Sequence, residues 1–401
     1  MNARHQPVIV SAVRTPMGSF NGRFSSIPST QLGSIAIAGA LKRIHMPGEQ
    51  IDEVLMGCVL SAGLGQAPAR QAAIGAGLPH KTGAVTVNKV CGSSLQTVIM
   101  AARAIALGDA QIIVAGGMEN MTRAPFLLEK ARQGYRLGHG ELTDSLIKDG
   151  LWDVYNQFHM GNAGELCAAT YHFSRQEVDD FALESYSRAR EAITGGSFTR
   201  EIVPVEVPQK KGAPLIVTDD EEPDRVDLSR LRQLKPVFKD DGVLTVGNSP
   251  SCNDGAAALV VMAEEEAHRL GLTPMARIAG YAGAALAPEW FTIAPVEAIQ
   301  RLLKQTGLAV SDIDLFEINE AFSAVSLAIN RELGLDAKNV NVNGGAVALG
   351  HPIGATGARI LTTLVYAMEA RDARRGLASL CIGGGEALAL LVERPKKMQH
   401  Q

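Results

Sequence analysis

The sequence has no long apolar run and no strong excess of either charge. Apolar runs such as residues 256–263 are soon followed by charged residues and do not approach the roughly 18 residues that a membrane-spanning helix needs. The formal net charge is only −4, and the densest lysine pair before the C-terminal tail is Lys210 and Lys211. We therefore expect neither a membrane nor a nucleic acid as a partner.

The sequence also lacks a C-x-x-C pair, and its five cysteines are widely spaced. This spacing favours free thiols in a reducing compartment over a disulfide framework or a zinc site, so we expect no bound metal. The polar N-terminal residues 1–7 resemble no signal or transit segment, and residues 398–401 form no retention or peroxisomal address. These absences predict a cytoplasmic protein.

The composition is that of an ordinary folded, soluble protein, with 46% hydrophobic and 20% charged residues. A chain of 401 residues exceeds what one hydrophobic core usually serves, so two or three structural units are expected. Short apolar runs alternate with Ala-rich helical windows, which is the pattern of an α/β fold with strands buried on both faces. We expect strands at 8–12, 111–115, 257–262 and 377–382, and buried helices at 95–107 and 356–368.

Two parts of the sequence share one order of elements. In the first part, the run 51–54 is followed by a strand that leads to Cys91, then by an Ala-rich helix and a strand ending near residue 119. In the second part, the run 313–316 is followed at similar offsets by a short strand, a glycine-rich turn, a helix and a strand ending near residue 386. The repetition predicts two homologous α/β halves.

Between these halves the sequence becomes more polar, charged and irregular. We therefore predict an N-terminal half at 1–121, an inserted loop domain at 122–251 and a C-terminal half at 252–401. Within the insertion, windows of mixed charge at 146–152 and 175–192 predict surface helices.

Cys91 follows a β-rich run and precedes a predicted helix whose first turn is Gly92, Ser93 and Ser94. A sulfur at this position faces free backbone N–H groups and the positive end of the helix dipole, which lowers the pKa of a thiol. Cys91 is therefore a candidate nucleophile. Taken alone, the residue also fits a buried structural cysteine.

His351 lies in a glycine-rich stretch, residues 343–357, and precedes Pro352, which suits the start of a helix. A histidine there can face a cleft and act as a base, although a turn histidine with structural hydrogen bonds fits the same position. The glycine spacing matches neither G-x-G-x-x-G nor the P-loop, so we expect no dinucleotide.

Two further candidates stand at predicted strand ends. Cys381 ends the last apolar strand and precedes the glycines 383–385, whose backbone N–H groups can face a ligand. A cysteine beside such a turn fits an acid or base, and equally fits core packing. Asn319 follows the strand at 315–318, where it can hold a water, orient a base or cap the strand end.

The combination of these features resembles the thiolase family from end to end. The matching segments are V-I-V-S-A-V-R-T-P at 8–16, G-Q-A-P-A-R-Q at 65–71, V-N-K-V-C-G-S at 87–93, G-G-M-E-N-M at 116–121, N-D-G-A-A-A at 253–258, N-E-A-F at 319–322, the glycine-rich block around His351 and C-I-G-G-G at 381–385. The resemblance implies the α/β thiolase fold, two homologous βαβαβαββ halves with an inserted loop domain. It also implies a homo-oligomer, a tetramer in preference to a dimer.

By this resemblance Cys91 is the nucleophile, His351 is the base that activates it, and Cys381 is the acid/base that moves the α-proton of the second substrate. Two oxyanion holes are implied, one from His351 with a water held by Asn319, the other from the backbone N–H groups of Cys91 and Gly383. The implied reaction is the reversible condensation of two acetyl-CoA to acetoacetyl-CoA and CoA through an acyl-Cys91 intermediate. No cofactor is expected besides the coenzyme A thioesters themselves.

The resemblance also implies residues for substrate binding. His159 and Met160, in Q-F-H-M-G at 157–161, resemble the segment beside the thioester in short-chain thiolases, and a solvated loop histidine is the alternative. Phe322 in N-E-A-F is expected at the acyl pocket, and Arg225 in the stretch 225–235 near the nucleotide end of coenzyme A.

This chain departs from the family pattern at two places. The family commonly has N-A-S-G before N-D-G, with the serine touching coenzyme A, whereas this chain has Pro250 there and Ser251 beside it. We expect Ser251 to contact the substrate instead. Phe291 stands where short-chain members often have methionine, so the acyl pocket is expected to differ in shape.

Several other functions remain open at this point. A 3-ketoacyl-CoA thiolase of broader chain length would share every motif, and a decarboxylating β-ketoacyl synthase would share the fold and the cysteine nucleophile. Such synthases have His or Asn where this chain has Cys381, which argues against them. A cysteine protease fits the residue types but not the coenzyme A motifs, and a non-catalytic family member would not need all four catalytic positions.

Overall fold

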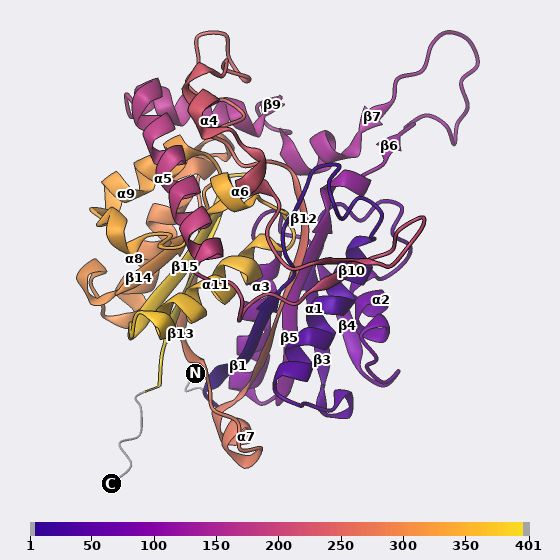
Figure 1. Ribbon diagram of the computed structural model, residues 1–401, viewed down its shortest axis with the longest axis vertical. Coiled ribbons are helices and arrows are strands. Elements are labelled where there is room, and N and C mark those ends of the chain that lie inside the picture. Colours follow the sequence, from indigo (N-terminus) through magenta and orange to yellow (C-terminus); the bar gives the residue numbers. More distant parts are fainter. Residues whose placement is uncertain (1–4, 396–401) are drawn as a thin grey trace.

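The computed structural model describes residues 5–395 (Figure 1). Residues 1–4 and 396–401 lie outside the described residues, and so does the C-terminal segment 398–401 considered above. The chain folds around a mixed β-sheet with helices on both sides. The expected α/β fold class is confirmed.

The helices and strands fall into two halves and an insertion. The first half contains β1 (Pro7–Arg14), β2 (Gly18–Ser19), α1 (Ser29–Arg43), β3 (Glu53–Gly57), α2 (Pro68–Gly75), β4 (Gly83–Val87), α3 (Ser93–Leu107), β5 (Ile112–Asn120) and β12 (Asn253–Ala263). After α7 (Glu264–Arg269), the second half contains β13 (Ala276–Ala285), η5 (Pro288–Ile293), α8 (Ala294–Thr306), β14 (Leu315–Ile318), α9 (Ser323–Leu333), α10 (Ala346–Leu349), α11 (Thr356–Ala370), β15 (Arg375–Ile382) and β16 (Glu386–Glu393).

The strand order of the sheet repeats between the halves. The first part runs β4-β3-β5-β12-β1 and the second runs β14-β15-β16-β13, with β13 beside β1. In the first part β3 is parallel to β4 and β5; in the second, β14 is parallel to β15, and its Phe316 forms a parallel bridge with Val340. Residue 340 therefore occupies the place that β4 occupies in the first half. The duplication predicted from the sequence is confirmed.

The strand β12 belongs to the first part of the sheet. It pairs with β5, for example Gly117↔Ala257, and with β1, for example Ala12↔Leu259. The predicted boundary at residue 252 is therefore wrong for the sheet, because the chain returns to the first half for one more strand before the second half begins. All eleven residues of β12 are buried, and this uniform apolar texture does not reveal which half the strand joins.

Helices form three layers around the two parts of the sheet. α3 and α11 pack against each other and against side chains from both parts, with Leu95, Ile99, Ile360 and Leu364 almost inaccessible to solvent. α1 and α2 cover the outer face of the first part, while α8 and α9 cover the outer face of the second. Each central strand thus has two buried faces, which accounts for the nearly continuous apolar runs.

The core helix α3 bears on the expectation that no apolar run is long enough to span a membrane. The segment 90–107 has a mean hydropathy of 1.4 over 18 residues, so by length and composition alone it passes that test and the expectation was wrong. In the structure, α3 lies between the two parts of the sheet, with most of its residues buried. Its apolar composition is explained by burial in the protein core.

The insertion lies between β5 and β12. It contains β6 (Phe126–Leu127), β7 (Thr143–Asp144), β8 (Trp152–Asp153), β9 (Phe158–His159), α4 (Met160–Thr170), α5 (Arg175–Thr194), β10 (Val205–Val207), β11 (Leu215–Val217) and α6 (Glu222–Arg225). The predicted helix at 146–152 is a short π-helix, Leu146–Leu151, and the one at 175–192 is α5, which starts at a capping box between Ser174 and Glu177. One face of α5 is buried against α10, so α5 packs over this part of the second half. The loop between β6 and β7 projects from the molecule (Figure 1).

Candidate active site

Cys91 lies in the turn between β4 and α3, as the sequence predicts. Lys89 donates its backbone N–H to the hydroxyl of Ser93 at 2.9 Å, and that hydroxyl donates to the carbonyl of Val90 at 2.6 Å. Val90 has a φ of 46°, a left-handed conformation that a β-branched residue rarely adopts. The turn is therefore held by its own side chains in a strained shape that presents Cys91 at the start of the helix.

The sulfur of Cys91 receives two backbone donors but is not acidic. Burial raises the pKa of the Cys91 thiol to about 11, and the N–H groups of Gly383 and of Cys91 itself lower it only in part. The expectation that the helix N-terminus lowers this pKa was therefore wrong in its net direction, because loss of hydration outweighs the donors. Cys91 needs a base to become a nucleophile at neutral pH.

His351 has the protonation state of such a base. Its Nδ1 lies 2.7 Å from the hydroxyl oxygen of Thr356, which donates its own proton to the carbonyl of Pro352 at 2.9 Å. Nδ1 must then carry the ring proton, which leaves the lone pair on Nε2. Nε2 is buried and has no hydrogen-bond partner among the described residues. Burial, with the nearby charge of Arg359, lowers the pKa of His351 to about 3.

The backbone around His351 is fixed by Asn253 of the first half. The side-chain oxygen of Asn253 accepts the His351 N–H at 2.9 Å, and its amide donates to the carbonyl of Gly18 at 3.0 Å. Gly350 precedes the histidine with a φ of 96°, and a Cβ there would lie 2.2 Å from the Asn253 side chain. Only glycine permits this approach.

Asn319 directly follows β14, and Cys381 is the last residue but one of the neighbouring strand β15. The backbone N–H of Asn319 bonds to the carbonyl of Ser379 at 2.9 Å, so the two strand ends stay in register. Both polar atoms of the Asn319 side chain are buried without a partner among the described residues. Cys381 is also buried, and burial followed by the proximity of Cys91 raises the pKa of its thiol. The structure thus brings Cys381 and Cys91 into one neighbourhood.

The predicted substrate residues Met160, His159 and Phe322 lie around the region that contains Cys91 and Cys381. A Cβ built at Gly383 would lie 3.5 Å from the sulfur of Met160, so the first residue of α4 reaches the turn beside Cys91. His159 accepts the Gly161 N–H on Nδ1 at 3.0 Å and stacks on Phe238, with ring centroids 5.1 Å apart. Phe238 in turn contacts Phe322 edge to face, at 5.8 Å.

The remaining predicted substrate residues have three different placements. Phe291 is buried in the same apolar cluster as Met160 and Cys381. The hydroxyl of Ser251 donates to the oxygen of Asn253 at 2.9 Å, the same oxygen that holds the His351 backbone. Arg225 is half exposed on α6 and lies 3.6 Å from Glu221. The structure does not bring Arg225 together with the catalytic candidates.

Glu119 is a buried residue of the motif at 116–121, and the sequence predicted no role for it. Its carboxylate accepts the N–H groups of Val59 at 3.0 Å, Leu60 at 3.2 Å and Gly354 at 2.9 Å. Burial raises its pKa to about 7, against these donors. Because Gly354 follows His351 by three residues, Glu119 ties the histidine loop of the second half to the first half. The signal in the sequence that could have identified Glu119 is its position near the end of a predicted strand, within the motif at 116–121.

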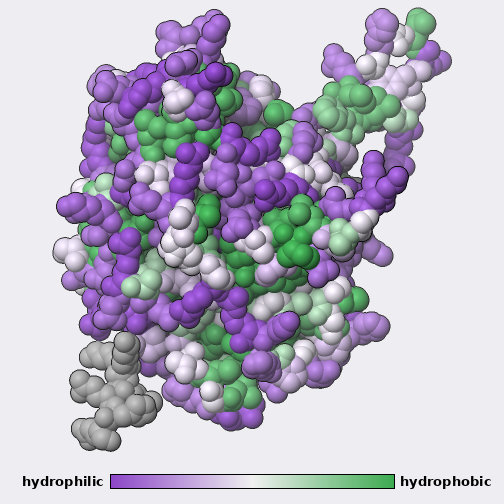
Figure 2. All heavy atoms as spheres, in the orientation of Figure 1, coloured by the Kyte–Doolittle hydropathy of each residue, from purple (hydrophilic) through white to green (hydrophobic). Residues whose placement is uncertain are grey.

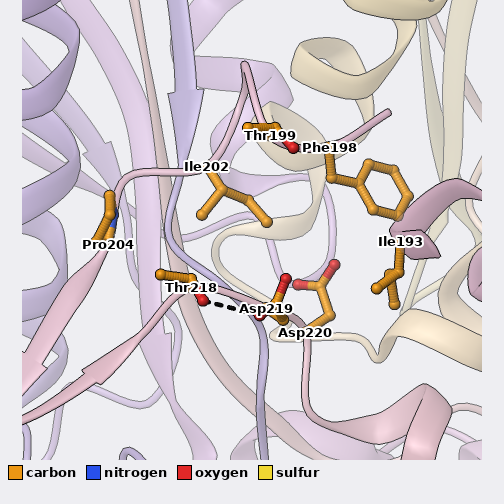
Figure 3. A pocket seen from close by; sticks show the side chains of 8 residues that line it. All are labelled: Ile193, Phe198, Thr199, Ile202, Pro204, Thr218, Asp219 and Asp220. Atoms are coloured by element: carbon orange, nitrogen blue, oxygen red, sulfur yellow. Dashed lines mark hydrogen bonds between the residues drawn. The ribbon is translucent and has the colours of Figure 1, made fainter. Parts of the chain in front are cut away.

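The cavity in Figure 3 lies elsewhere in the molecule. It has a volume of about 250 Å³ and is lined by the insertion residues Ile193, Phe198, Thr199, Ile202, Pro204, Thr218, Asp219 and Asp220. Asp220 already binds the buried guanidinium of Arg14 with both oxygens, at 2.6 and 2.8 Å. None of the candidate catalytic residues lines this cavity.

Comparison with known proteins gives two family matches. The model of the thiolase N-terminal domain matches residues 7–265, and that of the thiolase C-terminal domain matches residues 272–394. The first match ends after β12, in agreement with the sheet topology. Together they cover nearly the whole chain.

Relatives and solved structures agree with these matches. The acetyl-CoA acetyltransferases of Pseudomonas aeruginosa and Escherichia coli are 52% and 51% identical to this chain, over 96% of its length and 99% and 98% of theirs. The crystal structure of the Bacillus anthracis acetyl-CoA acetyltransferase has a TM-score of 0.96 at 39% identity, covering 98% of this chain and 100% of its own. The Acat5 thiolase from Ascaris suum in complex with coenzyme A has a TM-score of 0.92 at 43% identity, covering 97% and 100%. The chain belongs to the thiolase family.

Proposed function

We propose that this protein is an acetyl-CoA C-acetyltransferase, which condenses two acetyl-CoA to acetoacetyl-CoA and CoA and also runs in reverse. The proposal rests on buried polar side-chain atoms that lie close to Cys91 and Cys381 and have no hydrogen-bond partner among the described residues. The lone pair of His351 Nε2 and the amide of Asn319 are buried without partners among residues 5–395, beside two cysteines and a turn that offers the Gly383 N–H. Such groups are costly to bury unless a substrate uses them.

The first half-reaction transfers the acetyl group to Cys91. Nε2 of His351 takes the proton of the Cys91 thiol, and the sulfur attacks the thioester carbonyl of acetyl-CoA. The negative charge that develops on the carbonyl oxygen is stabilised by the N–H groups of Cys91 and Gly383, which face the sulfur. The tetrahedral intermediate collapses, and the departing CoA thiolate takes the proton from His351. Acetyl-Cys91, CoA and a neutral histidine remain.

The second half-reaction forms the carbon–carbon bond. Cys381 rests as a thiol because burial raises its pKa, so it first gives its proton to solvent. Its thiolate then removes an α-proton from the second acetyl-CoA, and His351 with Asn319 stabilises the charge on the enolate oxygen. The carbanion attacks the acetyl carbon, and Cys91 leaves as a thiolate. The proton on Cys381 then passes to Cys91, and Cys381 regains its resting proton from solvent, so both cysteines end the cycle as thiols. Burial raises the pKa of Cys381, which makes its thiolate a strong base.

The substrate contacts follow from the placement of the surrounding residues. We assign His159 and Met160 to the thioester and Phe291 and Phe322 to the acyl pocket, because all four lie in or beside one apolar cluster with Cys381. Ser251 is assigned to coenzyme A beside the catalytic loop. Arg225 is assigned to the nucleotide end, consistent with its position away from the catalytic residues. Coenzyme A thioesters are the only ligands this reaction needs, without metal or other cofactor.

The proposal is tested with purified protein and acetyl-CoA. Intact-mass measurement is expected to show one acetyl group per active subunit, and thiolysis rates are expected to rank acetoacetyl-CoA above its 2-methyl derivative and above longer 3-ketoacyl-CoA substrates. Faster thiolysis of long chains would favour a 3-ketoacyl-CoA thiolase of broad range. Condensation that requires malonyl-CoA would favour a decarboxylating synthase.

We also propose a homo-oligomer, a tetramer in preference to a dimer, located in the cytoplasm. The projecting loop between β6 and β7 carries exposed apolar side chains, including Phe126, Leu128, Leu137 and Leu142, and Figure 2 shows apolar surface at the base of this loop. Large exposed apolar groups are typical of protein–protein contacts. Light scattering after size-exclusion chromatography tests the assembly, and replacement of Leu137 and Leu142 by Ser is expected to reduce its mass. A monomer in the unmodified protein would contradict the proposal.

A further inference from the structure

The turn that contains Gly383 has no side chains of its own to hold it. The glycines 383–385 connect β15 to β16, and Gly384 and Gly385 have φ values of 90° and 92°. The carbonyl of Gly385 accepts the N–H of Leu286 at 2.8 Å, and the residues that flank the glycines, Ile382 and Glu386, pair with each other in the β15–β16 ladder. Three consecutive glycines have more backbone freedom than any other sequence. Contacts from outside the turn therefore contribute to the position of the Gly383 N–H.

One ion pair joins this turn to the turn that contains Cys91. The ammonium of Lys89, two residues before Cys91, contacts the carboxylate of Glu386, the residue directly after the glycines. Lys89 comes from the first half of the chain and Glu386 from the second. The backbone of Lys89 is itself held by Ser93, so its side chain projects from a fixed base.

The charged groups around this pair have other partners. Lys89 and Glu386 line a groove of about 330 Å³ together with Arg103 and Arg301. Arg103 lies over the ring of Tyr281 at 5.0 Å, and Arg301 pairs with Glu297. Lys89 is therefore the cation of this groove that contacts Glu386 directly.

We propose that Lys89 and Glu386 are positioning residues that set the Gly383 N–H against Cys91 and so complete the oxyanion hole for acyl transfer. This inference rests on the function proposed above. An oxyanion hole works only when its donors lie about 2.7–3.1 Å from the developing charge, so a small displacement of Gly383 lowers the rate. Because both side chains are partly exposed, the pair is weak, and we expect its loss to slow acetylation of Cys91 by about 2- to 5-fold.

The test measures single-turnover acetylation of Cys91 at saturating acetyl-CoA, with KM determined separately. Lys89→Gln and Glu386→Gln are each expected to lower the rate constant for acetylation, while their thermal midpoints stay near that of the unmodified protein. The double variant Lys89→Glu with Glu386→Lys is expected to recover most of the rate, because the pair is restored with reversed charges. Exchange of the acetyl α-protons with deuterium, which uses the other oxyanion hole, is expected to change little in all three.

Arg103→Gln is the matched control, because it removes a positive charge from the same groove without touching Glu386. If Lys89 acts only by attracting the anionic substrate, Lys89→Gln and Arg103→Gln will both raise KM and leave the acetylation rate constant unchanged. That result, or a charge-reversed pair no faster than the single variants, would overturn the inference. Failure of the unmodified protein to be acetylated at all would instead overturn the proposed function.

Discussion

Replacement of Asn319 by alanine separates catalysis from stability in this fold. Both polar atoms of the Asn319 side chain are buried without a partner among the described residues, so the substitution breaks no hydrogen bond to any of them. A buried amide without partners costs roughly 1–3 kcal/mol of folding free energy, and its removal recovers that cost. The smaller side chain leaves a gap that costs about the same. We therefore expect Asn319→Ala to change the free energy of unfolding by less than about 1 kcal/mol.

Asn341 supplies the matched comparison. It is a buried asparagine whose side chain accepts the Ile318 N–H at 2.8 Å and donates to the Ile318 carbonyl at 2.8 Å and to Glu320 at 2.9 Å. Three bonds are lost in Asn341→Ala, at about 1 kcal/mol each, and the groups left behind remain buried. The expected loss of stability is about 3 kcal/mol or more. The contrast depends only on where hydrogen bonds are already satisfied.

The assay pairs urea unfolding with condensation kinetics. Loss of one oxyanion donor costs about 100- to 1000-fold in rate, so Asn319→Ala is expected to lose condensation on that scale while it still acetylates Cys91. A loss of stability equal to that of Asn341→Ala would show that Asn319 is a structural residue. Retention of normal condensation would refute its place at the enolate oxygen.

Four further outcomes are expected. Cys91→Ala abolishes thiolysis and acetylation because no other group carries the acyl intermediate, and an acetyl adduct that persists by intact mass would contradict this. Cys381→Ala still acetylates but loses condensation and thiolysis by roughly 100-fold or more, the scale of general acid/base catalysis, as measured by steady-state kinetics. Phe291→Ala relaxes the preference for acetoacetyl-CoA, since each accommodated methylene is worth about 0.8 kcal/mol; equal use of 3-ketooctanoyl-CoA by the unmodified enzyme would refute the short-chain assignment. Because the pKa of His351 is lowered to about 3, its imidazole stays neutral above that value, and single-turnover acetylation is expected to show no acidic limb near pH 6.5.

The sequence predicts the fold well where local pattern and burial agree. The apolar runs at β1, β5 and β15 and the Ala-rich helices α3 and α11 are found where periodicity and composition place them. The boundary at residue 252 was wrong because β12 is apolar like every other central strand, and its partners are distant in sequence. Strand pairing at such separations is a property of the whole fold, which a single apolar run does not encode.

The chemistry of the site is harder to predict than its residues. The turn before α3 identifies Cys91 and the donors that face its sulfur, yet the thiol pKa is raised because the surrounding apolar clusters remove water from it. That desolvation comes from side chains such as Val59, Met121 and Ile353, which belong to three separate segments. For the same reason, the sequence contains Glu119 in a matching motif but does not show that its carboxylate holds the loop of His351.

The duplication itself explains how a nucleophile and a base come to face each other. Cys91 stands two residues before α3, and His351 is bound by Thr356, the first residue of α11. These helices occupy equivalent places in the two halves, and their first turns meet, since Ser94 accepts the Ala358 N–H at 2.9 Å. A helix start has free N–H groups, and here one is satisfied by the other helix. Packing two copies of one unit through these helices therefore aligns two equivalent turns, and divergence of those turns provides cysteine on one side and histidine on the other.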